Sequence, residues 1–382
     1  MFTKSNQCRV CNGSFFNEPL LILNNMPKAA QHLPDASMIE NEVGVTLEVH
    51  QCSKCGLIQL NNEPVSYYKE VIRASAFSAD MGAFRVKQFN NFVEKYNLKG
   101  KKVIEMGCGK GEYLQLMKGT GVDAYGIEFL DESVEFCNSQ GLKVYKEYID
   151  KTDTTIPSAP FDAFFIMNFF EHIPNINAAM AGLSKNLSDD SVGIIEVPNF
   201  DMMLRNKMFS EFIGDHLFYF TKDTLISTLN MNGFDVVECK EIWHDYIICA
   251  IVRKRKKTDL SSFHQQQKNI KEQINQYLAI YDLNQVAIWG AGHQAFAVMS
   301  LSDLRGKIKY VVDDAPFKQG KYTPATHISI VSASTLLTNP PQAIIIMAGS
   351  YSEEIVKKIQ NNEELNNINI SILKEHGLKK IR

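Results

Sequence analysis

A long uninterrupted apolar stretch is missing from this sequence. The longest apolar run covers residues 161–170 and is interrupted by Asp162 and Asn168. A membrane-spanning helix needs about 18 or more apolar residues, so we expect no membrane span. Residues 1–7 also lack the apolar core of a secretory signal. We therefore expect a cytoplasmic protein with no membrane partner.

An excess of charge of one sign is missing as well. Forty Lys and Arg residues oppose 43 Asp and Glu residues, which leaves a net charge of −3. The basic residues are scattered apart from a cluster at 253–257, so the positive field of a nucleic-acid-binding protein is not expected. Hydrophobic residues make up 45% of the 382 residues, which is enough to form buried cores. This composition excludes a mainly disordered chain and indicates two or three domains.

Cysteine is scarce, and its eight residues are too few and too unevenly placed for a disulfide framework. Four of them form two Cys-x-x-Cys pairs, Cys8 with Cys11 and Cys52 with Cys55. This spacing lets both sulfur atoms of a turn face one cation, and four sulfurs complete a tetrahedral zinc shell. Because no coordination position stays open, we expect a structural zinc. Four incidental thiols or a redox pair are the alternatives.

Three regions differ in their sequence patterns. Residues 1–75 combine the paired cysteines with short apolar runs, so we expect a zinc-binding domain that needs its metal to fold. Residues 76–255 alternate helical and strand patterns, which indicates an α/β fold with a parallel sheet. A linker helix is expected over 256–283, where apolar residues recur at helical spacing. Alternation of strands and helices then resumes over 284–382, which predicts a second nucleotide-type fold.

Within the central region the pattern predicts particular elements. A helix is expected over 84–96, and apolar runs predict strands at 103–106, 124–127, 161–167 and 192–197. Two further runs, 234–237 and 246–252, lie close together and predict a pair of strands at one edge of the sheet. The expected architecture is a Rossmann-like sheet with helices on both faces.

A glycine-rich turn follows the first expected strand of this region. Gly107, Gly109 and Gly111 let the backbone approach a ligand closely, where a Cβ would clash. Glu105 precedes them and would repel a pyrophosphate, so the pattern differs from the dinucleotide fingerprint and suits a ligand with a cationic amino-acid end. Glu128 closes the next strand, where it can accept both hydroxyls of a ribose.

These residues resemble the motif of the class I S-adenosylmethionine-dependent methyltransferases, an acid followed by Gly-x-Gly-x-Gly with an acid closing the next strand. The resemblance covers roughly residues 80–252 and implies that S-adenosylmethionine binds here, with the glycines at its methionine end and Glu128 at its ribose. Cys108 lies between the glycines, and we interpret it as a small packing residue of the cofactor site rather than a nucleophile. Binding of NAD is the alternative.

Two histidines follow expected strands at the carboxyl edge of the sheet, where open α/β sheets bind their ligands. His172 follows Glu171, and His216 follows Asp215 at the start of an aromatic segment that ends at Phe220. An imidazole accepts a proton near neutral pH, and a carboxylate beside it can orient it. We therefore expect a general base among these residues.

The whole chain resembles the zinc-containing C-methyltransferases of deoxysugar biosynthesis. The matching segments are the two cysteine pairs and residues 196–200, 215–220, 312–314 and 318–324. The resemblance implies enolisation of a nucleotide-linked 4-keto-6-deoxysugar, followed by attack of the enolate carbon on the sulfonium methyl. It assigns catalysis to His216 and Asp215, with His172 as a further active-site histidine and Tyr219 in the same segment.

The chain also departs from that family. Ile213 and Asp215 stand where the family has tyrosine and glutamate, and the tyrosines and serines that follow Tyr67-Tyr68 in the family are replaced. O- or N-methylation of a related sugar nucleotide, or a non-catalytic module that binds zinc and nucleotide, therefore remain alternatives. The sequence does not predict an oligomeric state.

The third region contains a weak dinucleotide fingerprint. Gly290-Ala291-Gly292 follows an expected strand, and Asp313 lies at the end of the next one. A redox cofactor here would make the protein a fused dehydrogenase. The family resemblance implies instead a degenerate nucleotide fold that helps to cover the substrate.

Overall fold

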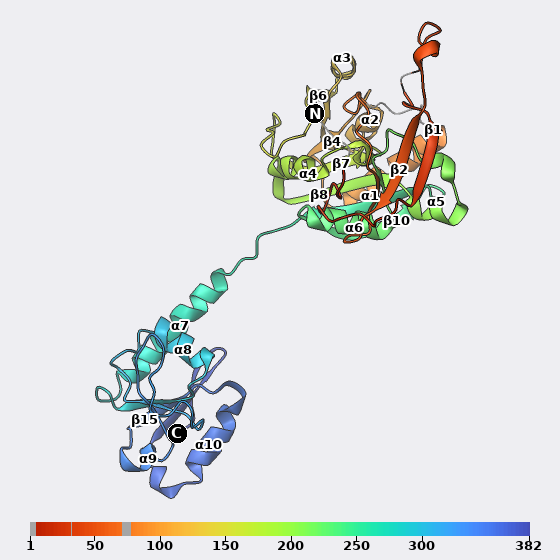
Figure 1. Ribbon diagram of the computed structural model, residues 1–382. Coiled ribbons are helices and arrows are strands. Elements are labelled where there is room, and N and C mark those ends of the chain that lie inside the picture. Colours follow the sequence, from red (N-terminus) through yellow and green to blue (C-terminus); the bar gives the residue numbers. More distant parts are fainter. Residues whose placement is uncertain (1–4, 32, 71–77) are drawn as a thin grey trace. The chain divides into compact units, whose positions relative to one another are not determined.

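The computed structural model describes residues 5–31, 33–70 and 78–382 (Figure 1). The chain forms two compact units, 1–256 and 257–382. Residues 71–74, which belong to the segment that departs from the family after Tyr68, lie outside the described part of the chain. No helix in the described part is long and apolar enough to cross a membrane.

The first unit is built on a seven-stranded sheet. In spatial order the strands are β10 (Phe234–Ile242), β11 (Ile247–Lys254), β8 (Leu187–Pro198), β7 (Phe161–Met167), β4 (Lys102–Met106), β5 (Asp123–Glu128) and β6 (Lys143–Lys146). The five strands from β8 to β6 run parallel, whereas β11 lies antiparallel between β8 and β10. The parallel arrangement brings the carboxyl ends of five strands to one edge.

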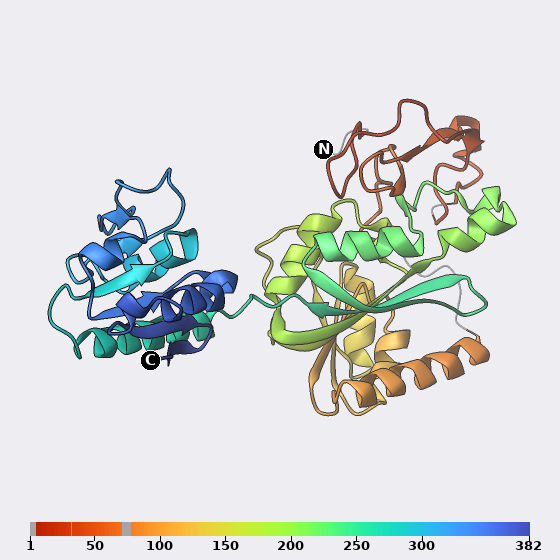
Figure 2. The ribbon, with the colours of Figure 1, turned by 90° about the horizontal axis from the view of Figure 1, so that it is seen from below.

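Helices cover both faces of this sheet. One face carries α1 (Ala79–Lys95), α2 (Glu112–Lys118) and α3 (Asp131–Ser139), and the other carries α4 (Ile176–Lys185) and α6 (Lys222–Met231). Figure 2 shows α1 in orange and α6 in green on opposite sides of the sheet. Along β4, Val103 packs in one core cluster and Ile104 in the other. Burial on both faces explains why these strands are nearly continuous apolar runs.

The N-terminal residues form a second, antiparallel sheet in the same unit. Its strands in order are β1 (Leu21–Met26), β2 (Val45–Gln51), β3 (Ile58–Leu60) and β9 (Phe218–Tyr219). Strand β9 comes from the segment that follows β8, α5 (Phe200–Asn206) and the short helix η3 (Phe209–Glu211), yet it pairs Tyr219 with Ile58. The cysteine-containing part and the aromatic segment after His216 therefore share one sheet.

The second unit has a six-stranded sheet that is parallel except at one edge. Its strands in order are β14 (Ile330–Val331), β13 (Val311–Val312), β12 (Val286–Trp289), β15 (Ala343–Ile346), β16 (Asn369–Lys374) and β17 (Gly377–Lys380). Its helices are α7 (Ser261–Leu278), α8 (His293–Leu301), α9 (Thr335–Thr338) and α10 (Ser352–Gln360). The helix expected as a linker is α7, whose Ile274 and Tyr277 are buried in the core of this unit.

The structure confirms the mixed α/β fold with nucleotide-type sheets. The runs expected at 103–106, 124–127, 161–167 and 192–197 lie in β4, β5, β7 and β8, and the expected edge pair is β10 with β11. Strand β6 was not predicted, because only Val144 among its four residues is buried and flanking lysines obscure the pattern. The short antiparallel sheet of the N-terminal part was not predicted either.

Candidate functional site

The glycine-rich turn between β4 and α2 has the backbone that the sequence predicts. Gly107, Gly109 and Gly111 have φ angles of +72°, +55° and +81°, a region that strongly favours glycine. A Cβ on Gly107 would lie 2.8 Å from the ring of Phe169, and one on Gly111 would lie 2.5 Å from Leu142. Both close approach and backbone angle therefore require glycine in this turn.

Glu128 at the end of β5 is tied to the same turn. Its Oε2 accepts the Gly109 N–H at 2.9 Å, and its Oε1 accepts the N–H groups of Phe129 and Leu130 at 2.8 and 3.1 Å. A carboxylate offers about four acceptor positions, and the backbone fills three of them. The buried Glu128 carboxylate thus orders the glycine turn and retains one position for a ligand hydroxyl.

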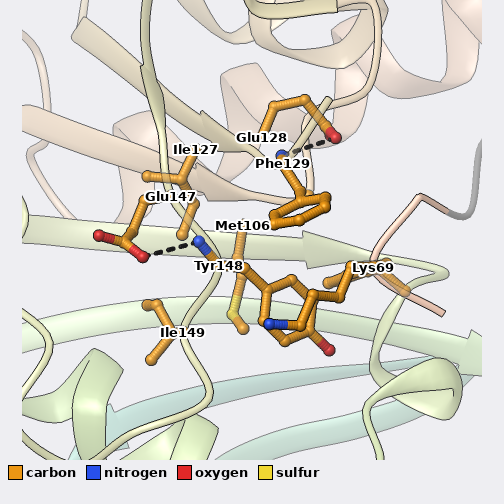
Figure 3. Close-up of a pocket in the computed structure, with 10 residues that line it drawn as sticks. Lys69, Met106, Ile127, Glu128, Phe129, Glu147, Tyr148 and Ile149 are labelled. Atoms are coloured by element: carbon orange, nitrogen blue, oxygen red, sulfur yellow. Dashed lines mark hydrogen bonds between the residues drawn. The ribbon is translucent and has the colours of Figure 1, made fainter. Parts of the chain in front are cut away.

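A pocket opens beside the turn at the carboxyl edge of the sheet (Figure 3). Its lining residues are Lys69, Met106, Gly107, Ile127, Glu128, Phe129, Glu147, Tyr148, Ile149 and Phe169. A second pocket shares Tyr148 and Ile149 with it and extends to Ile173, the neighbour of His172. The two pockets therefore share a wall, and the second one reaches the residue that follows His172 in the chain.

Lys69 reaches this pocket from the N-terminal part of the chain. Its Nζ lies 2.8 Å from Oδ2 of Asp150 and 4.7 Å from the centre of the Tyr148 ring. Figure 3 shows the Lys69 side chain lying against that ring. Sequence analysis did not identify Lys69, Phe129 or Tyr148. Only Phe129 carried a signal, because it directly follows the expected ribose ligand.

Glu105 and Cys108 do not line the pocket. Both are completely buried, and Cys108 packs in the core cluster that also contains Leu114. The pKa of Cys108 is raised by its hydrogen bond with the Cys137 thiol and by burial. A Cβ at Gly126 in β5 would lie 2.8 Å from the Cys108 sulfur. The small Cys108 side chain, which follows β4, therefore fills the space against β5.

The two histidines lie together. His172, in the short helix η2 (Phe170–His172), and His216 have ring centres 4.7 Å apart. Nδ1 of His172 is 2.8 Å from the carbonyl oxygen of Asp215, and the His172 ring lies 6.4 Å from that of Phe169, which lines the first pocket. The structure thereby brings two imidazoles from distant segments to the same edge as the glycine turn.

The Asp215 carboxylate is directed toward the N-terminal part of the chain. Its Oδ1 accepts a hydrogen bond from the Tyr67 hydroxyl at 2.6 Å, and its Oδ2 accepts the Ala30 N–H at 3.1 Å. Asp215 therefore contacts the histidine cluster through its backbone carbonyl. Tyr67 is a further residue of the site. The sequence analysis names it only as part of Tyr67-Tyr68 and does not predict a role for it.

Tyr219 holds the loop before His216. Its buried hydroxyl accepts the N–H of Ile213 at 3.0 Å and donates to the carbonyl of the same residue at 3.2 Å. Burial raises the pKa of this phenol. In this structure the Tyr219 hydroxyl is thus engaged with the backbone and stabilises the segment that carries Asp215 and His216.

Burial sets the charge states of the histidine cluster. It lowers the pKa of His172 to about 4 and the pKa of His216 well below its ordinary value. It raises the pKa of Glu171, which precedes His172, to about 8. At neutral pH both imidazoles are therefore neutral, and a neutral imidazole is the form that accepts a proton.

The four paired cysteines converge in the N-terminal part. The Cys8 and Cys55 sulfurs are 3.7 Å apart, and the Cys11 and Cys52 sulfurs are 3.4 Å apart. All four sulfurs lie within 4.8 Å of one another, and Gly56 has the expected positive φ of +77°. Burial raises the pKa of the Cys55 thiol and so favours its neutral form. A cation bound among the four sulfurs would counteract this effect and stabilise the thiolate.

Comparison with known proteins finds similarity to methyltransferases along most of the chain. Residues 82–239 match the family model of a methyltransferase domain, and residues 253–370 match that of a C-methyltransferase C-terminal domain. C-methyltransferase NovU of Streptomyces niveus is 22% identical over 383 residues, which cover 92% of this chain and 91% of that protein. The two family models and this relative together support a C-methyltransferase. The chain is an S-adenosylmethionine-dependent methyltransferase.

Other relatives of this C-methyltransferase match only parts of it. A ubiquinone biosynthesis O-methyltransferase of Methylococcus capsulatus is 27% identical over 94 residues, which cover 23% of this chain and 40% of that enzyme. Among solved structures, an S-adenosylmethionine-dependent methyltransferase from Clostridium acetobutylicum is 12% identical, with a TM-score of 0.39, and the match covers 50% of this chain and 96% of that one.

The glycine turn fits the cofactor of a methyltransferase. The positive φ angles and the missing Cβ atoms give a backbone that can lie against a ligand. Apart from the two chain neighbours of Gly109, no heavy atom of the described residues lies within 4 Å of the Cβ position at this glycine. Met106, Ile127 and Phe129 add apolar walls beside Glu128. Apolar walls beside a carboxylate suit a nucleoside with free ribose hydroxyls.

Proposed function

We propose that this C-methyltransferase methylates the carbon beside the ketone of a nucleotide-linked 4-keto-6-deoxysugar. The observation that carries the proposal is the pair of neutral imidazoles, buried His172 and partly exposed His216, whose ring centres lie 4.7 Å apart. Carbon methylation of a ketone needs a base that removes a carbon-bound proton, and water must be kept from the enolate. The resemblance to the deoxysugar C-methyltransferases supports this class of acceptor.

In this proposal S-adenosylmethionine, when bound, supplies a methyl group on a positively charged sulfur. His216 accepts the proton from the carbon beside the ketone, and the enolate carbon that results would be the acceptor of the methyl group. His172 lies beside His216, with its ring centre 4.7 Å away, and is held by the carbonyl of Asp215. Buried Phe218 and Phe220 help to exclude water.

Cofactor binding is assigned to the glycine turn and its neighbours. Gly107, Gly109 and Gly111 hold the methionine end, and Glu128 accepts a ribose hydroxyl through the acceptor position that the backbone leaves open. Glu105 stabilises the cationic amino-acid end from beneath the turn. The acceptor sugar occupies the second pocket, whose lining residues include Tyr68 and Asn175.

The cysteine cluster is proposed to hold one structural zinc. Zinc–sulfur bonds of about 2.3 Å in a tetrahedron separate the sulfurs by roughly 3.8 Å. The separations of 3.7 Å for Cys8 with Cys55 and 3.4 Å for Cys11 with Cys52 are close to this value. The metal would hold together an N-terminal part that has few helices and short strands.

Deuterium exchange tests the carbon chemistry. The protein is incubated in deuterium oxide with a nucleotide-linked 4-keto-6-deoxysugar and without S-adenosylmethionine, and exchange at the carbon beside the ketone is followed by mass spectrometry. We expect exchange that His216→Ala abolishes. If no exchange occurs but the same sugar nucleotide is methylated once S-adenosylmethionine is added, O- or N-methylation is favoured instead. Failure to bind S-adenosylhomocysteine in calorimetry would favour a non-catalytic module.

A further inference from the structure

Three potential metal-ligating side chains meet at the histidine cluster, far from the cysteines in sequence. One ligand atom each from Glu171, His172 and His216 lie within 4.8 Å of one another. Oε1 of Glu171 is 3.9 Å from Nε2 of His172. Two imidazoles and one carboxylate form a ligand set that is common for divalent transition metals.

The Glu171 carboxyl is buried, and one of its oxygens lacks a hydrogen-bond partner among the described residues. The residue is 1% exposed, and its Oε2 has no hydrogen-bond partner among the described residues. A buried polar atom without a partner costs free energy. A cation bound in the cluster would give the Glu171 carboxylate the partner that its Oε2 atom lacks.

His172 is held in the manner of a metal ligand. Its Nδ1 is paired with the carbonyl oxygen of Asp215 at 2.8 Å, so Nδ1 carries the hydrogen and Nε2 keeps its lone pair. A backbone carbonyl commonly orients a metal-ligating imidazole in this way. The lone pair of Nε2 lies on the side of the ring that faces Glu171.

We propose that Glu171, His172 and His216 form a second metal site, which binds one divalent transition-metal ion such as Zn²⁺, Co²⁺ or Ni²⁺. Nitrogen ligands at about 2.1 Å from a tetrahedral ion lie roughly 3.4 Å apart. The three ligand atoms, which lie within 4.8 Å of one another, must therefore move slightly closer together to bind the ion. Among the three side chains, Glu171 and His172 are buried and His216 is partly exposed.

Metal in this site opposes the proposed reaction. The ion takes the imidazole lone pair that His216 would use to accept the carbon-bound proton. The metal-loaded protein is thus an inhibited form, and this consequence rests on the proposed function. Binding of the ion itself rests only on the three side chains, so the two proposals can fail separately.

Cobalt provides the test. Protein that already carries zinc on its cysteines is titrated with Co²⁺, and the bound metal is counted after dialysis. We expect one additional Co²⁺ per chain, with visible d–d absorption but without the intense near-ultraviolet band of a cobalt–thiolate bond. Glu171→Gln keeps the size of the side chain and should weaken Co²⁺ binding by at least tenfold. The matched control, Glu94→Gln at an exposed position of α1, should bind as the unaltered protein does.

Three results would overturn the metal site. These are the absence of a second equivalent, a spectrum with thiolate bands only, and equal Co²⁺ affinity in Glu171→Gln and Glu94→Gln. Circular dichroism and the zinc content of Glu171→Gln show whether that variant is folded. His216→Asn provides a second variant, which should also lose the additional cobalt. If deuterium exchange fails while cobalt binds as expected, only the proposed function is refuted.

Discussion

The hydroxyl of Tyr67 donates a buried hydrogen bond of 2.6 Å to the carboxylate of Asp215. The two residues are 148 positions apart, and Asp215 holds Nδ1 of His172 through its carbonyl oxygen. The N-terminal part of the chain therefore reaches the histidine cluster through two consecutive hydrogen bonds. This connection gives the cysteine-containing part a role in positioning the site.

Replacing Tyr67 by Phe should destabilise the first unit and slow methyl transfer. A hydrogen bond to a charged group contributes about 1.5–3 kcal/mol, and the Asp215 carboxylate would be left buried with one partner fewer. Urea unfolding and turnover measure the two effects. Tyr322→Phe is the control, since Tyr322 is exposed in the second unit. Equal stability of the two variants would contradict this role of Tyr67.

His216→Ala should lower turnover while cofactor affinity stays nearly unchanged. Loss of a general base typically costs about 10²- to 10⁴-fold in rate, and Ile213 cannot replace it because its side chain carries no proton to exchange. The measurement combines turnover with calorimetry of S-adenosylhomocysteine. His244→Ala, at an exposed histidine, serves as control. If His216→Ala keeps more than half of the turnover and His172→Ala abolishes it, the two roles are reversed.

Glu128→Ala should weaken the binding of S-adenosylhomocysteine by about 1.5–3 kcal/mol. The substitution removes the ribose acceptor and also the carboxylate that holds the Gly109 N–H. Calorimetric dissociation constants provide the measurement. Glu132→Ala, at an exposed position of α3, should bind like the unaltered chain. An unchanged dissociation constant for Glu128→Ala would refute the assignment.

One zinc per chain should be found by elemental analysis of protein purified without chelator. Structural zinc contributes on the order of 10 kcal/mol to folding, so Cys52→Ser or Cys55→Ser should unfold the N-terminal part and release the metal. Cys239→Ser is the matched control, because Cys239 lies outside the cluster. Zinc contents well below one per chain in the unaltered protein would rule out this site.

The stability of the metal-free histidine cluster should fall as the pH rises from 6.5 to 8. Burial raises the pKa of Glu171 to about 8, so the folded state keeps a proton that the unfolded state has already lost. His172 and His216, with lowered pKa values, are neutral in the folded state, but each is about half protonated in the unfolded state at pH 6.5 and loses that proton as the pH rises. They therefore offset part of the loss from Glu171, and the net loss over about 1.5 pH units is about 1 kcal/mol.

Urea unfolding at several pH values measures this loss. Glu171→Gln cannot ionise and should remove that part of the pH dependence, whereas Glu94→Gln should keep it. The same slope in all three proteins would show that Glu171 is already ionised in the folded state.

The sequence by itself determined the features that depend on neighbouring residues. Alternating apolar runs predict β4, β5, β7 and β8 because strands buried on both faces must be apolar along their length. The glycine turn and the two cysteine pairs are likewise local. Their spacing is set by what a backbone must do to approach a ligand or to turn two sulfurs toward one ion.

Only the tertiary structure decided which distant residues share an environment. The sequence places Asp215 beside His216, but the fold directs its carboxylate to Tyr67 and its carbonyl to His172. Nothing in the local pattern indicates that Lys69 lies in the cofactor pocket or that Glu171 is buried. Side-chain direction and desolvation depend on packing between segments far apart in the chain, and these decide hydrogen-bond partners and pKa values.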